Sequence, residues 1–186
     1  NSVTVTGYMN QVKDVTIPNQ IDERDVTKIG NLAFIWSGIE NLILPESLIE
    51  IGTLAFHEIL IKSLELPSKL SIIGIGAFSE NEILEVVYIP KSVMIIGESA
   101  FSNFRGEMNI FAEIFEKPIG WDSTWNQSGH PVQWNVSQYT VSNDFLAVIQ
   151  EGKAKIIKYT GVETVIVVQS TIMGYQVSSM ASYAIS

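Results

Sequence analysis

Apolar residues recur along this chain in a unit of about 22 residues. The unit begins with Ile-Gly-x-x-Ala-Phe, and its copies start at Ile29, Ile51, Ile73 and Ile96. Their glycines are 22, 22 and 23 residues apart. Ahead of the later copies, a pattern of the Leu-x-x-Leu-x-Leu type ends in a proline at Pro45, Pro67 and Pro90. Because side chains alternate across a β-strand, this second pattern predicts one short strand per unit, with an apolar inner face.

A single unit of this length cannot bury its apolar face alone, so successive units must stack as coils. We therefore expect a right-handed solenoid of about five coils and of the α/β class. A parallel sheet forms one side, and short helical turns or irregular segments form the other. Within each Ile-Gly-x-x-Ala-Phe, we expect the Ile inside, the Gly at a corner needing a positive φ or close backbone approach, and the Phe in an aromatic stack.

A longer variant of the coil is expected at both ends of the chain. Residues 8–34 align with residues 159–185 at an offset of 151, and both copies carry the same five-residue insertion. Before the second copy, residues 145–149 and 153–159 flank Glu151-Gly152, a pattern typical of a β-hairpin. These features predict that each block opens with a hairpin and that the native protein continues at both ends.

The sequence therefore divides into three expected parts. Residues 1–110 form a repeat block, residues 111–136 a Trp-rich closing segment, and residues 137–186 a hairpin with the truncated start of a second block. The closing segment contains Gly-Trp-Asp-Ser-Thr-Trp-Asn from Gly120. Two interpretations of its tryptophans stay open: Trp121 and Trp125 cover the end of the stack, which we favour, or they form a calcium or sugar platform with Asp122 and Asn126.

The Ile-Gly-x-x-Ala-Phe coils resemble the BspA-like leucine-rich repeats, the LRR_5 class, of bacterial surface proteins, most clearly over residues 8–104. The segment from Gly120 to Asn126 is similar to the stretch that closes blocks of such repeats. The last copy departs from the pattern, because Gln169 replaces the proline and Met-Ala-Ser-Tyr-Ala-Ile from Met180 replaces the Ile-Gly unit. The resemblance implies an extracellular, secreted or cell-surface module that binds protein or glycan on host or neighbouring cells.

Composition removes several classes of partner. Lys and Arg total 11 against 20 for Asp and Glu, and the net charge of -9 would repel nucleic acid and anionic membranes. No cysteine is present, so disulfides and thiolate metal sites are excluded. The longest apolar runs, such as residues 165–168, fall far short of the roughly 20 residues that cross a bilayer. We expect no membrane insertion.

Candidate catalytic chemistry is sparse, and we expect no enzyme, no metal and no cofactor. The two histidines, His57 and His130, are predicted to be structural or surface residues. No Gly-x-Ser-x-Gly elbow is present to aim a serine nucleophile. An enzyme hidden in the tryptophan segment is a third hypothesis, but only Asp122, Glu113 and Glu116 with His130 could serve it.

The outward strand positions are the candidate binding face, and we expect them to line one continuous sheet surface. They are Asp14, Thr16, Asn41, Ile43, Ser63, Glu65, Val86 and Tyr88. Three of them, Ile43, Val86 and Tyr88, are apolar where a solvated face would be polar. The face predicts an adhesion-type binding module. The alternative is a structural spacer within a larger surface protein, with no ligand of its own.

Overall fold

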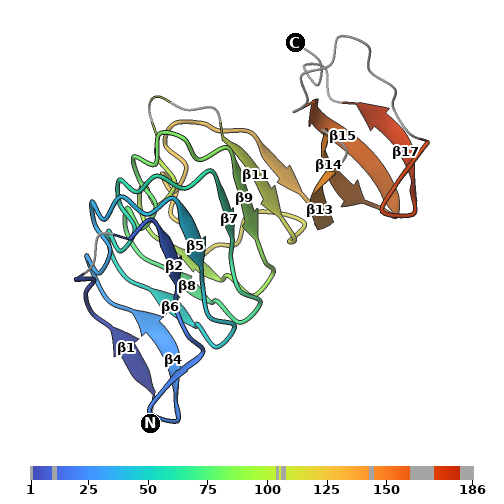
Figure 1. The fold of residues 1–186 in the computed structure, drawn as a ribbon. Coiled ribbons are helices and arrows are strands. Elements are labelled where there is room, and N and C mark those ends of the chain that lie inside the picture. The colour runs from blue at the N-terminus through green and yellow to red at the C-terminus, as the bar shows by residue number, and fades with distance from the viewer. Residues whose placement is uncertain are drawn as a thin grey trace.

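The computed structural model describes residues 2–9, 12–103, 105, 108–142, 145–159 and 170–180. It shows a β-solenoid followed by a smaller β unit (Figure 1). The strands of one solenoid sheet are paired in parallel in the order β1 (Val3–Val5), β4 (Arg24–Ile29), β6 (Glu50–Ile51), β8 (Ile72–Ile73) and β10 (Ile95–Ile96). A short strand, β3 (Gln20–Ile21), forms a hairpin with β4. The predicted parallel stacking of coils is confirmed.

A second row of strands runs along the solenoid. Its members are β2 (Asp14–Thr16), β5 (Asn41–Ile43), β7 (Ser63–Glu65), β9 (Val86–Ile89), β11 (Asn109–Ala112) and β12 (Val132–Trp134). This row was predicted from the proline-terminated pattern, whereas the first row, which runs through the Ile-Gly units, was not. Inner positions such as Leu64 and Val87 are buried, as the alternation required.

The expected α/β class is wrong, because the described residues contain no helix. The physical reason lies in the turns that follow each Ile-Gly. Their backbone amides donate to the next coil rather than along the chain: Leu54 N to Ile75 O at 2.9 Å and Phe56 N to Ala77 O at 2.9 Å. Residues such as Leu54 and Glu58 also have positive φ, which interrupts any right-handed helix. The turn side therefore forms a second set of bonds between coils.

The repeated glycines are required by close approach, not by a positive φ. A Cβ built on Gly74 would lie 2.6 Å from the carbonyl carbon of Gly52 and 2.6 Å from the amide nitrogen of Thr53 in the preceding coil. Real Cβ atoms do not approach backbone so closely, so any side chain here would push two coils apart.

The predicted aromatic stack is confirmed. The ring centroids of Phe34, Phe56, Phe78 and Phe101 are 5.1, 5.3 and 5.5 Å apart in sequence, and their planes differ by 10° or less. Tyr8 continues the stack at one end, 5.3 Å from Phe34, and Trp125 closes the other end edge-on, 5.9 Å from Phe101. The stack lies within the main hydrophobic core.

The tryptophans of the closing segment cover the end of the solenoid. Trp121 is 2% exposed and Trp125 is 5% exposed, and their rings lie 4.9 Å apart. The Trp121 indole Nε1 donates to the carbonyl of Val93 at 3.1 Å. Asp122 accepts from the amide and hydroxyl of Thr124 at 2.7 and 2.6 Å, which lowers the pKa of its carboxyl. The favoured interpretation is confirmed, because buried ring faces cannot serve as a sugar platform.

The C-terminal unit repeats the structure that opens the chain. It contains β13 (Val136–Ser142), β14 (Phe145–Gln150), β15 (Lys153–Tyr159), β16 (Thr171–Ile172) and β17 (Tyr175–Met180). The predicted hairpin joins β14 and β15 through Glu151 and Gly152, both at positive φ. β16 and β17 form a second hairpin and β17 runs parallel to β15, as β3, β4 and β1 do at the start of the chain.

The duplication extends to the register of pairing. Val3 pairs with Val26 and Val5 pairs with Ile29, with one irregularity between them. Adding the offset of 151 gives Ala154 with Val177 and Ile156 with Met180, and these pairs also flank an irregularity. The five-residue insertion is therefore the β3 hairpin. Gln169 and the residues after Met180 lie outside the described residues.

Candidate binding groove on the strand face

The candidate binding residues occupy outward positions of four strands. Within one pair of strands, Asp14 lies beside Asn41 and Thr16 beside Ile43. Within the next pair, Ser63 lies beside Val86 and Glu65 beside Tyr88. Within each pair of strands, the outward residues therefore lie side by side, as predicted.

The face is not continuous, and this part of the prediction is wrong. β2 and β5 form one small sheet, whereas β7 belongs to a separate sheet with β9, β11 and β12. No ladder joins β5 to β7, so the strand row is split between them, although the coils remain joined in the other sheet through β6 and β8. The sequence pattern of a single repeat cannot reveal this split, because every repeat equally predicts that its strand pairs with the strand of the next repeat.

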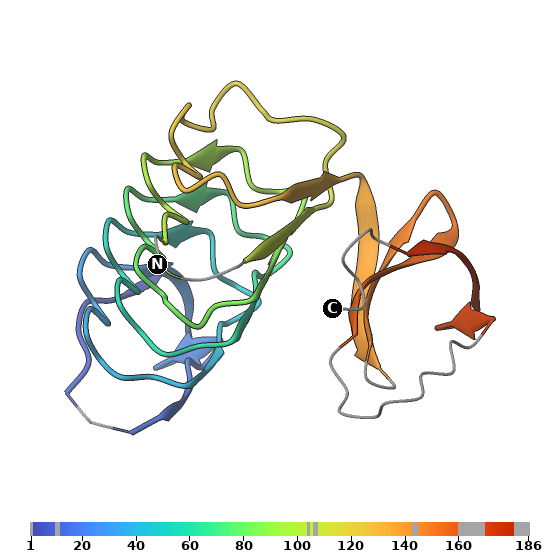
Figure 2. The ribbon, with the colours of Figure 1, turned by 90° about the horizontal axis from the view of Figure 1, so that it is seen from above.

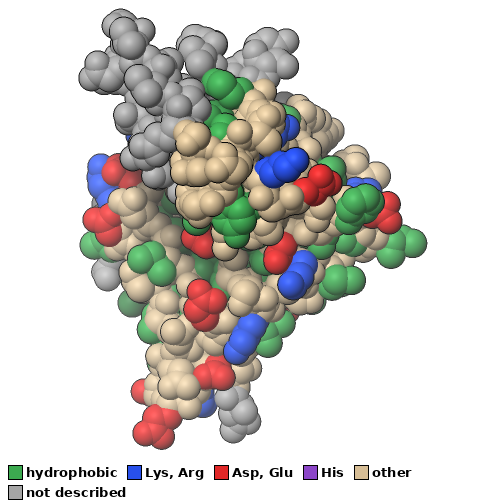
Figure 3. All heavy atoms as spheres, turned by 90° about the vertical axis from the view of Figure 1, so that its right-hand side faces the viewer, with side chains coloured by type: hydrophobic (Ala, Val, Ile, Leu, Met, Phe, Trp, Pro, Cys, Tyr) green, Lys and Arg blue, Asp and Glu red, His purple; other side chains and the backbone are tan. Residues whose placement is uncertain are grey.

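Two hollows flank the split, and Ile43 lines both of them. The first hollow has a volume of about 680 Å³ and is lined by Glu40, Asn41, Leu42, Ile43, Leu60, Lys62, Ser63 and Ile83. The second hollow has a volume of about 410 Å³, and its lining includes Ile43, Glu46, Glu65, Pro67, Tyr88 and Glu113. Acidic and hydrophobic side chains lie close together on the side of the molecule seen in Figure 3. We call the two hollows together the split groove.

The first hollow carries an exposed apolar cluster. Ile43 is 61% exposed, Leu60 44% and Ile83 41%, although all three are large hydrophobic side chains. They come from three successive coils, so stacking places them together. This cluster is therefore a candidate contact surface.

The second hollow is anionic. Its carboxylates are Glu46, Glu65 and Glu113. Glu113 is held by Lys91, whose amide donates to Oε2 at 2.9 Å and whose ammonium lies 3.5 Å from Oε1. In the part of the chain that the structure describes, no ion pair engages Glu46 or Glu65. The hollow thus favours cationic groups and repels anionic ones.

Tyr88 forms one wall of the second hollow and also contacts the C-terminal unit. Its hydroxyl donates to the carbonyl of Ser137 at 3.2 Å, and its ring stacks on Tyr139. Burial, together with the charges of Glu113 and Glu65, raises the pKa of Tyr88 to about 12. The phenol therefore stays neutral and can keep donating across the physiological range.

Val86 is covered by the C-terminal unit. It is only 7% exposed and packs in a cluster with Val136, Leu146 and Phe111. The exposed apolar character predicted for Val86 is therefore wrong, because β13 and β14 bury it. Figure 2 shows the smaller unit beside the late coils of the solenoid.

At the other end of the face, the polar positions satisfy one another. The amide of Asn41 donates to the carboxylate of Asp14 at 2.5 Å, and Lys13 pairs with Glu40 at 2.6 Å. The pair with Glu40 raises the pKa of Lys13. Both contacts are exposed and stabilise the protein little. This end is a solvated surface.

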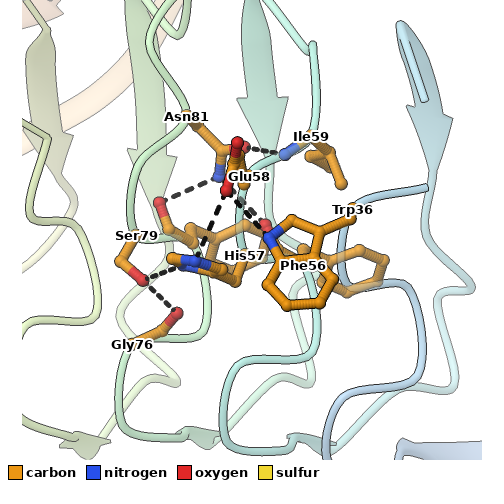
Figure 4. Close-up of polar contacts among 9 residues, drawn as sticks. Trp36, Phe56, His57, Glu58, Ile59, Gly76, Ser79 and Asn81 are labelled. Carbon is orange, nitrogen blue, oxygen red and sulfur yellow. Dashed lines mark hydrogen bonds and ion pairs between the residues drawn. The ribbon is translucent and has the colours of Figure 1, made fainter. Parts of the chain in front are cut away.

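One group of side chains combines a serine, a histidine and a carboxylate from neighbouring coils (Figure 4). The Ser79 hydroxyl lies 2.8 Å from the carbonyl oxygen of Gly76, to which it donates, and 2.7 Å from His57 Nδ1. Glu58 lies 3.8 Å from His57 Nε2 and accepts from the indole of Trp36 at 2.8 Å. These contacts join three coils.

Asn81 and His130 are also structural. Asn81 donates to the carbonyls of Phe56 and Phe78 and accepts from the amide of Ile59 at 2.7 Å, which ties two coils together. His130 is 9% exposed, and burial lowers its pKa. Among the described residues, no group of three or more acidic or histidine side chains could hold a metal ion, and no helix could cross a membrane.

Comparison with known proteins identifies the repeat. A family model described as the BspA type leucine rich repeat region matches residues 7–116 in six copies. The crystal structure of the T. pallidum leucine-rich-repeat protein TpLRR matches with a TM-score of 0.50 and 21% sequence identity, over 72% of this chain and 74% of that one. This likeness supports the fold. No curated protein sequence matches the chain.

Proposed function

The chain belongs to the BspA-type leucine-rich-repeat family, and on this premise we propose that it is a non-enzymatic module of a bacterial cell surface. In this proposal it binds a protein on a host or neighbouring cell, and the split groove is the binding site. The partner places apolar side chains in the first hollow and a basic side chain in the second.

The exposed apolar cluster of Ile43, Leu60 and Ile83 is the observation that carries this proposal. Covering each of these half-exposed side chains would stabilise a complex by about 1 kcal/mol. The cluster lies beside Glu46 and Glu65, which have no ion-pair partner in the described part of the chain. Charge at the rim of an apolar contact sets orientation and speeds association.

The rival function is a spacer that holds another domain away from the cell. A spacer gains nothing from an exposed apolar cluster, because such a cluster promotes aggregation unless a partner covers it. Polar positions that satisfy one another, as Asp14 and Asn41 do, suit a spacer better. The exposed apolar side chains of Ile43, Leu60 and Ile83 in the split groove suit it less well.

Binding to an array of matrix proteins, mucins and glycans tests the proposal. The informative variant is Ile43→Asp/Leu60→Asp, because both side chains are exposed and neither packs in the core. Ile95→Asp is the matched control, since Ile95 is 47% exposed on a strand of the other sheet. Tyr88 is a poor probe, because its replacement also disturbs the C-terminal unit.

We expect saturable binding to a protein that is lost in the double variant and kept in Ile95→Asp. Binding that persists in the double variant would place the site elsewhere. Binding to glycans alone would exclude a protein partner. Absence of binding across the array would favour the spacer.

A further inference from the structure

We propose that Trp36 and Glu58 bind an arginine side chain of the protein partner, beside the split groove. This inference rests on the proposed function, because the hollow at Trp36 continues the groove. The hollow has a volume of about 570 Å³, and its lining includes Trp36, Gly38, Glu40 and Leu60. Glu40 and Leu60 also line the first hollow of the split groove. A partner segment that lies in the groove can therefore extend to Trp36.

The indole of Trp36 has no role in the core of the solenoid. It is 69% exposed and lies outside the hydrophobic clusters of the described residues. The equivalent positions of the next two coils, six residues after the repeated glycine, carry Glu58 and Glu80. All three residues share a left-handed backbone, with φ of 55°, 55° and 56°. The conformation therefore belongs to the repeat, whereas the exposed indole is particular to this coil.

The carboxylate of Glu58 is held at the edge of this indole (Figure 4). Its Oε2 accepts from Nε1 of Trp36 at 2.8 Å and lies 3.8 Å from Nε2 of His57. Among the described residues, no hydrogen bond or ion pair engages its Oε1. The Glu58 side chain is 60% exposed, so this second oxygen can accept a hydrogen bond from a ligand.

A guanidinium group matches the indole and the carboxylate together. Its flat face can lie on the indole ring, which attracts a cation, while an N–H at its edge donates to Glu58. The apolar stem of an arginine can pack along Leu60, which is 44% exposed. The ammonium of a lysine cannot stack in this way. The charge of Lys13, which also lines the hollow, is offset by its ion pair with Glu40 at 2.6 Å.

Titration of the full chain with three capped tripeptides tests this inference. They are acetyl-Gly-Arg-Gly-amide, the corresponding lysine peptide, and a citrulline peptide that keeps the shape of arginine without its charge. The indole N–H signal of Trp36 in a proton–nitrogen NMR spectrum reports binding, and Trp36→Ala identifies this signal by its loss. We expect a saturable shift with the arginine peptide and about tenfold weaker binding of the other two peptides.

Glu58→Gln is the informative variant, because its amide oxygen can still accept from the Trp36 indole while the charge is lost. Glu98→Gln is the matched control, because it removes an exposed carboxylate three coils away from Trp36. We expect Glu58→Gln to weaken binding of the arginine peptide about tenfold and Glu98→Gln to leave it unchanged. Equal responses to the three peptides, no response to the arginine peptide, or unchanged binding by Glu58→Gln would overturn the inference.

The tripeptide titration needs no partner protein, so its failure is distinguishable from failure of the proposed function. If a protein of the array binds the split groove while the arginine peptide does not bind, only this inference fails. If the arginine peptide binds while no protein of the array does, only the proposed function fails. A shift of the Trp36 signal with methyl glucoside but not with the arginine peptide would assign the indole to a glycan and overturn the inference.

Discussion

The ring of Tyr88, on the strand face of the solenoid, stacks on the ring of Tyr139 in the C-terminal unit, with centroids 5.4 Å apart and planes 26° apart. The Tyr88 hydroxyl also reaches the backbone of Ser137. This contact joins the two units and removes part of the predicted binding face from solvent.

Replacing Tyr88 is expected to loosen the C-terminal unit. Tyr88→Ala should lower the free energy of unfolding by about 2 kcal/mol, because a half-buried aromatic pair is lost. Tyr88→Phe keeps the stacking and should cost less. Hydrogen exchange of the β13 and β14 amides, together with chemical denaturation, measures both effects. Equal protection of β13 in wild type and Tyr88→Ala would show that the contact does not hold the unit.

Because two coils approach closely at Gly74, adding a single methyl group there is predicted to destabilise the protein strongly. Gly74→Ala should destabilise the protein by about 3 kcal/mol, because the new Cβ meets backbone atoms that cannot move independently. Gly7→Ala is the matched control, since no heavy atom of another residue beyond its chain neighbours lies within 4 Å of a Cβ built there. Thermal unfolding of both variants measures the difference. Similar melting temperatures would contradict the close-approach argument.

The burial of Trp121 in the closing segment predicts that replacing it destabilises the protein far more than replacing the exposed Trp36. Trp121→Ala should destabilise the protein by about 4 kcal/mol, because Trp121 is 2% exposed and fills the end of the core. Trp36→Ala should have a much smaller effect, because Trp36 is 69% exposed. Urea denaturation of the two variants provides the test. Comparable losses would mean that the closing segment does not seal the stack.

The burial of His130 predicts that the protein loses stability in mild acid. Burial lowers the pKa of His130 below its ordinary value of 6.5, so the unfolded chain binds this proton more readily than the folded protein. The contribution of neutral His130 is fully present above pH 6.5 and is lost as the pH falls below that value. Melting temperatures between pH 7.5 and 5 should fall more in wild type than in His130→Gln. An identical pH dependence in the two proteins would refute the role of His130.

The periodic features were predictable because they depend on residues within one or two coils. Phe56 and Phe78 share a position in the repeat, so coil stacking alone brings their rings together. The repeat offset likewise predicted that the C-terminal unit copies the start of the chain, and Glu151-Gly152 indicated the turn between β14 and β15. In each case the interaction partner lies at a fixed sequence distance.

The α/β class was expected wrongly, and of the two forms expected for the turn side, short helical turns or irregular segments, the described residues show the irregular one. Sequence periodicity does not decide between them, because it does not show where backbone amides donate. The amides of Leu54 and Phe56 bond to the next coil, and that choice depends on the neighbouring coil being already in place. The short strands at the Ile-Gly units were missed for the same reason, since two residues such as Ile51 and Glu50 carry no alternation that a pattern could reveal.

By itself, the sequence determined the repeat length, the inward side chains and the aromatic stack, because each follows from a local unit stacked on its copies. The structure decided that the repeated glycines are required by close approach rather than by a positive φ. Only the tertiary structure decided which outward residues remain exposed. The packing of β13 and β14 buries Val86, whereas Ile43 stays exposed. The burial of Val86 arises from a contact between segments at no fixed sequence distance, and the same alternation of side chains is compatible with either outcome.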